Sequence, residues 1–269
     1  MKLSNKNIWI SFALVMALGL GGTVGFSVYS AEHYSCNTLI VDVKGDLVTS
    51  YATSQLVGED SQYVTYSDYV AKFLEEIDKS STIKAVIVDI DSYGGLPVAG
   101  EEIANALKRF SKENVALIRS AGLSSAYWSA SGAKHILASK NSDVGSIGVS
   151  LQLRNLVEKN KKEGIRVTSI TSGEYKGIGD PNRELTKEEK DLLQVDVDKI
   201  HDNFVSAISE NRGLSKEKVT LLANGASMLG DKALENGLID ELGDMAQAKE
   251  YLAKQLGTDV RICTPPQAE

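Results

Sequence analysis

Two short segments of this 269-residue chain combine residue types that covalent chemistry on a carbonyl group requires. In Asp91–Gly95 (DSYGG), the glycine pair Gly94 and Gly95 lets a backbone N–H approach a ligand closely, as an oxyanion hole requires. In Ala121–Trp128 (AGLSSAYW), the hydroxyl of Ser124 stands where a strand is expected to give way to a helix, whose positive end favours an alkoxide. Each segment alone also fits a structural role, since glycine pairs form tight turns and serines cap helices.

The elements around these segments alternate between strand and helix patterns. Apolar β-branched runs predict strands and apolar residues at helical spacing predict helices. The expected strands are 38–43 (ended by Gly45), 84–90, 115–118, 135–138, 166–170 and a short last one (DVRIC). The expected helices are 67–78 (with Ser67 as cap), 98–110, one beginning within 120–133, 151–163, 186–211 with its capping box TKEE, and two more. This alternation implies βαβ units and a mostly parallel sheet in one α/β domain over residues 36–269, with function at the carboxyl ends of the strands.

The first 31 residues differ from the rest of the chain. Lys2 and Lys6 precede Ile8–Val28, a stretch without charged residues that is about as long as a helix crossing a bilayer. We therefore expect residues 1–31 to be an uncleaved membrane anchor, with the positive end cytoplasmic and the remainder exported. A signal sequence cleaved after Ser30 is the alternative.

The chain has two cysteines, Cys36 and Cys263, near opposite ends of the expected exported part. In an oxidising compartment they fit a disulfide that ties these ends together, and they fit equally well two unrelated, partly buried thiols. A lipid anchor on Cys36 is disfavoured, because Tyr34 and Ser35 do not form a convincing lipobox.

Composition excludes some classes of function. The formal net charge is −7 and no run of Lys or Arg occurs, which argues against a nucleic-acid partner. The three histidines are scattered and neither CxxC nor HExxH occurs, so we expect no metal site and no cofactor.

Several motifs follow one another between about Leu39 and Gly243: DSYGG, AGLSSAYW, GSIGV, SGEYKGIGDPNREL, NRGLS and GDKALENGLIDELG. Their order resembles the signal peptide peptidase A family of Ser-Lys peptidases. The resemblance implies a Clp-protease/crotonase type of βαβ superhelical fold. By matching residues it also implies Ser124 as nucleophile, Lys176 as general base and Ser146 as the hydroxyl that holds the lysine. The implied oxyanion hole consists of Gly95, with its neighbour Gly94, and the backbone N–H of Ser125.

The chain departs from the family pattern at two places. Tyr93 stands where proline is common, and Ser125 with Ala126 stands where two glycines are common. These changes could narrow the subsite beside the nucleophile, move the attack to Ser125, or reduce activity. A lysine base must also be desolvated to accept a proton. Ile147, Ile170 and Ile178 are the apolar residues that we expect around the amine of Lys176.

A histidine-based triad is disfavoured. Related Clp-type peptidases would need a histidine near Val149, where none stands. His135 falls in an expected strand, and His201 is interpreted as a packed or solvated residue of the long helix.

The sequence therefore predicts a membrane-anchored serine endopeptidase, single-pass, with its catalytic part on the extracytoplasmic side. The resemblance implies released signal peptides or other short, unfolded, apolar peptides as substrates. One catalytic domain per chain, without a tandem duplication, suggests that a ring-like homo-oligomer builds the full site. In the family that the chain resembles, the serine and the lysine can come from neighbouring subunits. Two alternatives are a catalytically impaired membrane scaffold of the same fold, and a crotonase-like acyl-CoA enzyme, which export to the outside of the cell disfavours.

Overall fold

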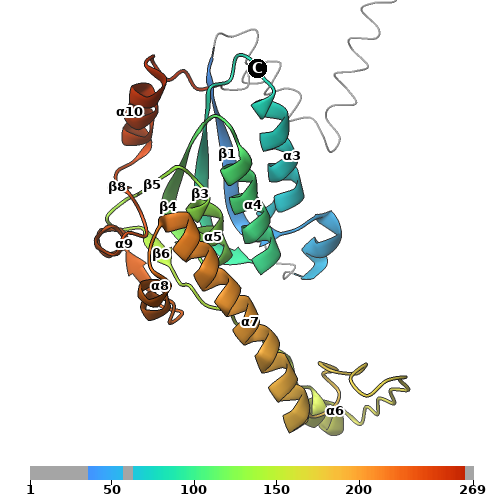
Figure 1. Ribbon diagram of the computed structural model, residues 1–269. Coiled ribbons are helices and arrows are strands. Elements are labelled where there is room, and N and C mark those ends of the chain that lie inside the picture. The colour runs from blue at the N-terminus through green and yellow to red at the C-terminus, as the bar shows by residue number, and fades with distance from the viewer. Residues whose placement is uncertain (1–35, 57–62, 264–269) are drawn as a thin grey trace, which may run out of the picture.

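The computed structural model describes residues 36–56 and 63–263, which form a sheet with helices on both faces (Figure 1). The strands are β1 (Thr38–Val48), β2 (Val64–Tyr66), β3 (Ala85–Gly95), β4 (Glu113–Leu123), β5 (His135–Ala138), β6 (Asp143–Gly145), β7 (Ser227–Leu229) and β8 (Glu241–Leu242). The helices are η1 (Tyr51–Leu56), α3 (Ser67–Asp78), α4 (Pro97–Arg109), α5 (Ser125–Ser131), α6 (Val157–Glu163), α7 (Lys187–Arg212), α8 (Lys216–Leu222), α9 (Gly230–Asn236) and α10 (Met245–Leu256).

The sheet is mostly parallel, as the alternation of strands and helices predicts. Its order is β2-β1-β3-β4-β5-β8, and β6 pairs with β4 beside this path. Only the pairing of β6 with β7 is antiparallel among the described strands. This arrangement fits the Clp-protease type of fold.

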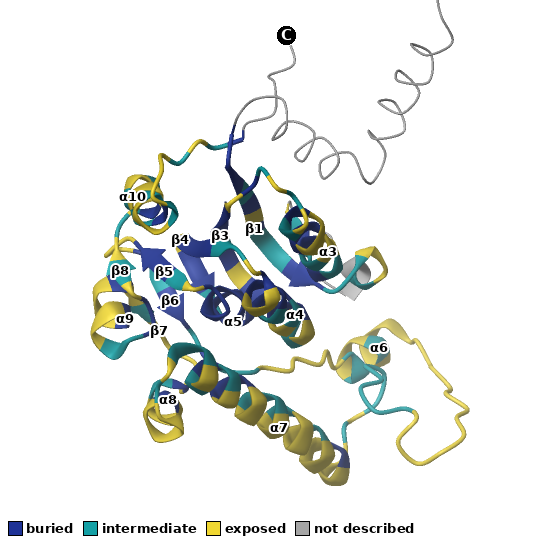
Figure 2. Cartoon of the chain, turned by 45° about the horizontal axis from the view of Figure 1, so that its top comes forward, coloured by how far each residue is buried: buried dark blue, intermediate teal, exposed yellow. Residues whose placement is uncertain are grey.

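The central strands are buried on both faces, because alternate side chains point to opposite sides of a sheet. On β3, Val86, Val88 and Ile90 belong to the large apolar core, which also contains residues of α3, α4 and α5. Ala85 and Ile87 face the other way, into a smaller core with residues of α10. Figure 2 shows this buried centre in dark blue, flanked by helices whose outer sides are exposed.

Strand β1 continues past Gly45, where the sequence pattern predicted its end. Gly45 has φ +67°, and the register of β1 against β3 shifts between Lys44 and Asp46. A Cβ on Gly45 would lie 1.9 Å from the carbonyl oxygen of Tyr63, so only glycine fits this bulge. Beyond it, Leu47 of β1 pairs with Gly95, which supports the predicted oxyanion segment from the side.

Residues 151–185, which we call the arm, project from the body at the far end of α7 (Figure 1). Two expectations fail here: the helix is only Val157–Glu163, with no buried residue, and no strand forms over 166–170. A strand needs a neighbour to satisfy its backbone groups, and the arm lies away from the sheet. Figure 2 shows the outer loop of the arm as exposed.

Smaller differences concern the ends of elements. Strand β4 continues to Leu123, so α5 begins only at Ser125. Tyr66, not Ser67, occupies the cap position of α3. Three helices, α8, α9 and α10, follow α7 instead of two, and the last predicted strand contributes only a bridge between Ile262 and Thr38.

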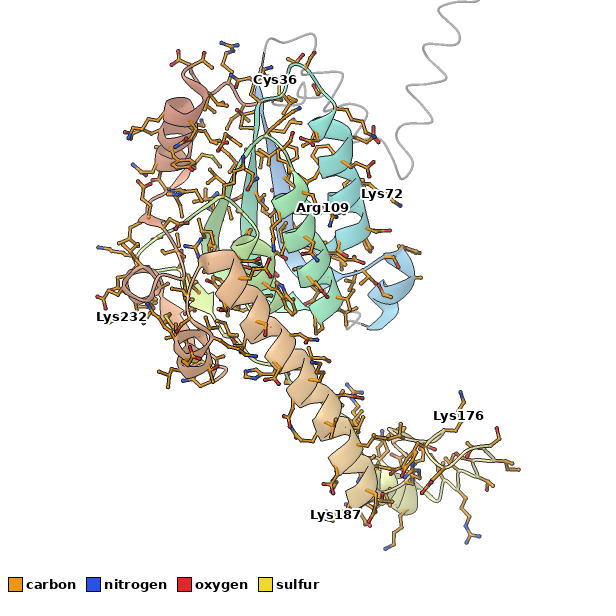
Figure 3. All side chains as sticks on the ribbon, viewed as in Figure 1. Cys36, Lys72, Arg109, Lys176, Lys187 and Lys232 are labelled. Carbon is orange, nitrogen blue, oxygen red and sulfur yellow. A yellow bond between two sulfur atoms is a disulfide. The ribbon has the colours of Figure 1, made fainter. Side chains whose placement is uncertain are left out.

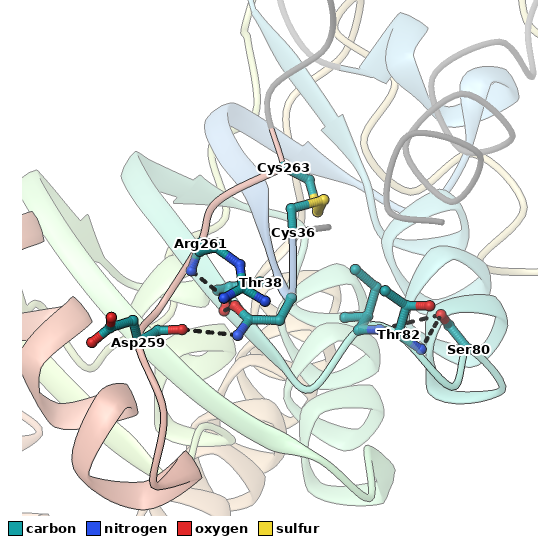
Figure 4. The surroundings of a disulfide bond; sticks show 9 residues. Cys36, Thr38, Ser80, Thr82, Asp259, Arg261 and Cys263 are labelled. Carbon is teal, nitrogen blue, oxygen red and sulfur yellow. Dashed lines mark hydrogen bonds between the residues drawn. A yellow bond between two sulfur atoms is a disulfide. The ribbon is translucent and has the colours of Figure 1, made fainter. Parts of the chain in front are cut away.

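A disulfide joins Cys36 to Cys263, which decides between the two alternatives that the sequence left open (Figure 4). The two Cα atoms lie 5.1 Å apart. Beside the bridge, Asn37 donates to the carbonyl oxygen of Asp259 at 2.9 Å, and its own side-chain oxygen accepts from the N–H of Arg261 at 2.9 Å. The two ends of the described chain are thus held together.

Within residues 36–56 and 63–263, no helix is both long and apolar enough to cross a bilayer. The predicted anchor, residues 1–31, lies outside these ranges.

Candidate active site

A cavity of about 680 Å³ opens at the carboxyl ends of β3, β4 and β6. Its walls include four of the predicted site residues: Ser124, Ser125, Ser146 and Gly95. The ends of parallel strands meet at one edge of a sheet, so the segments that follow β3, β4 and β6 are brought together there.

Ser124 and Ser146 lie side by side in this cavity. They directly follow Leu123 of β4 and Gly145 of β6, which are register partners, and the N–H of Ser124 donates to the carbonyl oxygen of Gly145 at 2.8 Å. Their φ angles are +52° and +49°, and they are the only non-glycine residues with positive φ in the described part of the chain. Backbone strain of this kind concentrates at functional sites, where the surrounding structure maintains it.

The side chain of Ser124 does not cap α5, although its position before the helix would allow that role. No hydrogen bond joins its hydroxyl to the first turn of the helix. The residue is only partly buried, and it stands at a strained strand-to-helix turn. Its hydroxyl therefore does not act as the helix cap, and the residue lines the cavity.

The hydroxyl of Ser125 has different surroundings. Ser125 is only 2% exposed, and its Oγ is buried without a hydrogen-bond partner. The residue packs on Gly100 of α4, where an added Cβ would lie 2.8 Å from the Cβ of Ser125. As the first residue of α5, Ser125 has a backbone N–H without an acceptor inside the helix.

Gly94 approaches the serine turn closely. A Cβ on Gly94, whose φ is +109°, would lie 2.9 Å from the Cβ of Ser124 and 3.2 Å from the backbone nitrogen of Ser125. The N–H of Gly94 donates to Oγ of Ser92 at 3.0 Å, so it is already in use. The N–H of Leu96 donates to the carbonyl oxygen of Leu47 on β1 at 2.8 Å.

Ser146 is held by the loop 223–226 that follows α8. Its Oγ donates to the carbonyl oxygen of Gly225 at 2.9 Å, and its N–H donates to that of Ala226 at 3.2 Å. The N–H of Gly225 in turn donates to the carbonyl oxygen of Ile147 at 3.1 Å. Ser146 therefore faces the cavity from a well-connected loop.

The structure does not bring Lys176 to Ser124 within one chain. Lys176 is exposed on the arm, far from the body, as Figure 3 shows. Two of the apolar residues expected around its amine lie apart, because Ile170 is 95% exposed on the arm and Ile147 is buried in the body. The loop next to Lys176 is held by Arg183, which donates to the carbonyl oxygen of Gly177 at 2.6 Å.

His201 also lines the cavity, a role that the sequence did not indicate. It lies within α7 and is partly buried, in agreement with its interpretation as a packed residue of the long helix. It shares its wall with Phe204 of α7 and Trp128 of α5, whose rings stack with centroids 4.7 Å apart. His201 and Phe204 are three residues apart and thus on one face of a helix, which is the sequence signal that relates them.

A profile of peptidase family S49 matches residues 106–259, which is more than half of the chain. The chain belongs to peptidase family S49. A relative from Methanocaldococcus jannaschii, "Putative protease MJ0651", is 34% identical over 225 residues, which cover 82% of this chain and 69% of the relative.

Other S49-related sequences carry more specific names. "Protease 4" of Haemophilus influenzae is 30% identical over 222 residues, covering 81% of this chain and 35% of the relative. "Putative signal peptide peptidase SppA" of Enterococcus faecium is 28% identical over 185 residues, covering 68% of this chain and 54% of the relative. These similarities confirm the resemblance to the signal peptide peptidase A type and support a peptidase. The S49 profile spans Ser124, Ser146 and Lys176, whereas Gly94 and Gly95 precede it.

Proposed function

We propose that this S49 protein is a serine endopeptidase with Ser124 as nucleophile and Lys176 as general base. The observation that carries the proposal is the placement of Ser124 at a strained turn in the cavity wall. Its hydroxyl does not cap the helix, and Gly95, Ser125 and Ser146 line the same cavity. A serine at such a strand-to-helix turn is a common arrangement for a nucleophile.

The proposed reaction proceeds through an acyl-enzyme. The neutral amine of Lys176 takes the hydroxyl proton of Ser124 while Oγ attacks the carbonyl carbon of the peptide bond. The oxyanion that forms is stabilised by backbone N–H groups. Its collapse breaks the C–N bond, and the lysine ammonium returns the proton to the leaving amine. A water molecule, deprotonated by the same lysine, then hydrolyses the ester on Ser124.

Two backbone N–H groups are suited to hold the oxyanion. That of Ser125 is free of intrahelical bonding because it begins α5. In extended chain, successive N–H groups point to opposite sides. Since Leu96 donates toward β1, the N–H of Gly95 is expected to point away from β1, toward the serine turn. Gly94, whose N–H is bonded to Ser92, contributes by its lack of a side chain.

The buried state of the Ser125 hydroxyl supports Ser124 as the nucleophile over its neighbour. An attacking oxygen must reach a carbonyl carbon, and Oγ of Ser125 has almost no accessible surface. The serine that replaces glycine at position 125 is accommodated against Gly100 and leaves the backbone turn intact.

We further propose that Lys176 acts in the cavity of a second copy of the chain, within a ring-like homo-oligomer. The arm carries Lys176 away from its own body, together with exposed apolar side chains. Ile165, Val167 and Ile170 are 50%, 51% and 95% exposed. Apolar side chains gathered on a projecting segment mark a protein interface. Docking of the arm on a neighbour would bury them and desolvate the lysine amine.

The proposed location is the outer side of the cell membrane, with residues 1–31 as a single-pass anchor. The uncharged stretch 8–28 has the required length, and the disulfide between Cys36 and Cys263 suits an oxidising compartment. The stacked rings of Trp128 and Phe204 in the cavity wall suit apolar side chains of short, unfolded peptides, such as released signal peptides.

The test is hydrolysis of an unfolded apolar peptide by the detergent-solubilised full chain. Ser124→Ala and Lys176→Ala should each abolish turnover, while Ser125→Ala, which removes a buried oxygen only, should retain most of it. Full activity of Ser124→Ala would contradict the assignment of the nucleophile. Full activity of Lys176→Ala would contradict the assignment of the base.

Co-expression of the two inactive variants tests the second copy. If the dyad is shared between chains, random assembly of Ser124→Ala with Lys176→Ala restores an intact pair at about one site in four. If the dyad lies within one chain, no intact pair forms and the mixture stays inactive. Each variant alone, prepared in the same way, provides the background.

A catalytically impaired membrane scaffold is the second candidate, because within one chain no lysine of the described structure lines the cavity of Ser124. A fluorophosphonate probe separates the two candidates. An active peptidase should be labelled at Ser124 and lose the label in Ser124→Ala, whereas an impaired scaffold should not react.

A further inference from the structure

His201 occupies a part of the cavity that the proposed chemistry does not use. It extends from α7 into the wall shared with Ser124, while its backbone belongs to the half of α7 that packs on the body. The side chain is partly buried. A substrate side chain that fills this cavity would therefore lie against a wall that includes His201.

The hydrogen bonding of His201 defines which ring nitrogen is available. Nε2 lies 3.0 Å from the carbonyl oxygen of Ala223. A carbonyl oxygen can only accept, so Nε2 carries the proton, and Nδ1 of the neutral ring is a hydrogen-bond acceptor. Nδ1 has no hydrogen-bond partner within residues 36–56 and 63–263.

The remainder of the wall is apolar or uncharged. The stacked rings of Trp128 and Phe204, which are 4% and 2% exposed, contribute a small apolar area, and Ile200 adds an aliphatic one. No Asp, Glu, Lys or Arg of the described chain lines the cavity. An acceptor nitrogen in such surroundings favours a side chain that offers a donor, because a bound side chain without one displaces water and supplies no partner.

We propose that His201 is a specificity-determining residue, which makes the cavity prefer tyrosine over phenylalanine at the residue whose carbonyl Ser124 attacks. The aromatic ring lies against the apolar part of this wall, and the phenolic O–H donates to Nδ1 of His201. The inference rests on the proposed function, because it assumes that the cavity beside Ser124 receives the substrate.

The experiment compares two peptides that differ only in tyrosine or phenylalanine at this residue, at an alkaline pH where imidazoles are neutral. Binding is measured on the detergent-solubilised Ser124→Ala protein, and hydrolysis on the protein with Ser124 intact. Three substitutions are made in each background. His201→Phe removes both nitrogens, His201→Asn keeps an acceptor at the position of Nδ1, and His201→Gln keeps a donor for Ala223.

Wild-type His201 should favour the tyrosine peptide by about three- to tenfold in both binding and kcat/KM, the range expected for one hydrogen bond between uncharged groups. His201→Phe and His201→Gln should lose the preference, and His201→Asn should retain most of it. If His201 had a structural role alone, its replacement would lower the affinity and kcat/KM for both peptides equally. An unchanged ratio of the tyrosine to the phenylalanine peptide in His201→Phe therefore overturns the inference. The absence of any preference in the parent overturns it as well.

Binding separates this inference from the proposed function. A tyrosine preference in binding without hydrolysis of either peptide would leave the specificity of the cavity standing and contradict the peptidase. Hydrolysis of both peptides without a preference would support the peptidase and contradict the role of His201.

Discussion

The side-chain oxygen of Ser92 accepts a hydrogen bond from the backbone N–H of Gly94 at 3.0 Å. The same hydroxyl donates to the carbonyl oxygen of Gly45 at 2.6 Å, at the bulge of β1. Ser92 is 1% exposed, so water does not replace either partner readily. The conformation of the glycine segment beside Ser124 thus depends on a buried serine two residues before it.

Replacing this hydroxyl should weaken both folding and catalysis. Ser92→Ala leaves a buried N–H and a carbonyl oxygen without their partner, which we expect to cost about 1–3 kcal/mol of unfolding free energy. Because the proposed oxyanion donor Gly95 adjoins this bond, kcat should also fall. Ser142→Ala removes another buried hydroxyl, one that lies outside the cavity of Ser124, and should reduce stability without reducing kcat. Equal kcat values for the two variants would contradict the role of Ser92.

Gly100 of α4 should tolerate no side chain. A Cβ there would lie 2.5 Å from the carbonyl oxygen of Ser125 and 2.8 Å from its Cβ, and both belong to the residue that follows the proposed nucleophile, Ser124. We expect Gly100→Ala to displace α5 from α4, which should cost about 1–3 kcal/mol of unfolding free energy. The displacement should also move Ser124 and so remove most of the peptidase activity. Thermal unfolding and turnover measure the two effects. Glu101→Ala, at an exposed position of the same helix, is the control and should behave as the parent does.

The disulfide should contribute substantially to stability. The bridge closes a loop of 227 residues in sequence separation, and removal of a native disulfide commonly costs about 2–5 kcal/mol. Cys36→Ser with Cys263→Ser should therefore unfold at lower denaturant concentration than the parent. The parent in a reducing agent should match the double variant, whose own transition should not respond to reduction. Insensitivity of the parent to reduction would show that the bridge adds little.

The start of α7 should be sensitive to acid. The hydrogen bond from Arg183, followed by that from the N–H of Thr186, lowers the pKa of Glu189 from the usual 4.5 to about 2. A lowered pKa in the folded state stabilises the protein above the unfolded pKa, and this contribution is lost as the pH falls from about 4.5 toward about 2. The difference in unfolding free energy between the parent and Glu189→Gln should therefore shrink over this interval. Glu188→Gln, at an exposed position of the same helical turn, is the matched control.

The sequence pattern was sufficient to predict elements that are specified by residues close together in the chain. The runs at 38–43 and 84–90 are mostly apolar because most of their side chains are buried on the two faces of the sheet. The helix at 186–211 carries its own start signal in Thr186 and Glu189. The capping box at this helix is present, with the N–H of Glu189 donating to Oγ1 of Thr186 at 3.2 Å. Such features depend on neighbours in sequence.

Features that depend on distant segments were not predictable in this way. The continuation of β1 past Gly45 depends on contact with Tyr63 and pairing with β3, and the arm lacks the partner strand that a β-branched run at 166–170 would need. Strand β6 has only three residues, too few for a recognisable pattern, yet it places Ser146 beside Ser124.

The residues of the site also differ in whether neighbouring or distant segments of the chain position them. Ser124 and Gly95 could be placed together because each ends a parallel strand, whereas His201 reaches the cavity only through the packing of α7 on α5 and the loop after α8. The surroundings of Lys176 are set by the arm, whose exposed side chains make few contacts with the body. The residues next to Lys176 in sequence therefore do not indicate which side chains would surround its amine in the proposed site.

The disulfide of Cys36 and Cys263 also has a mechanical consequence. A pull on the chain before Cys36 acts first on this residue, at the start of β1, and the bridge passes part of the load to the carboxyl-terminal segment. β1 lies between β2 and β3, so peeling it away would break hydrogen bonds on both sides while Cys263 still held its end. A pulling force applied before Cys36 is therefore shared between β1 and the segment that ends at Cys263. The force does not separate β1 from the sheet starting at its first residue.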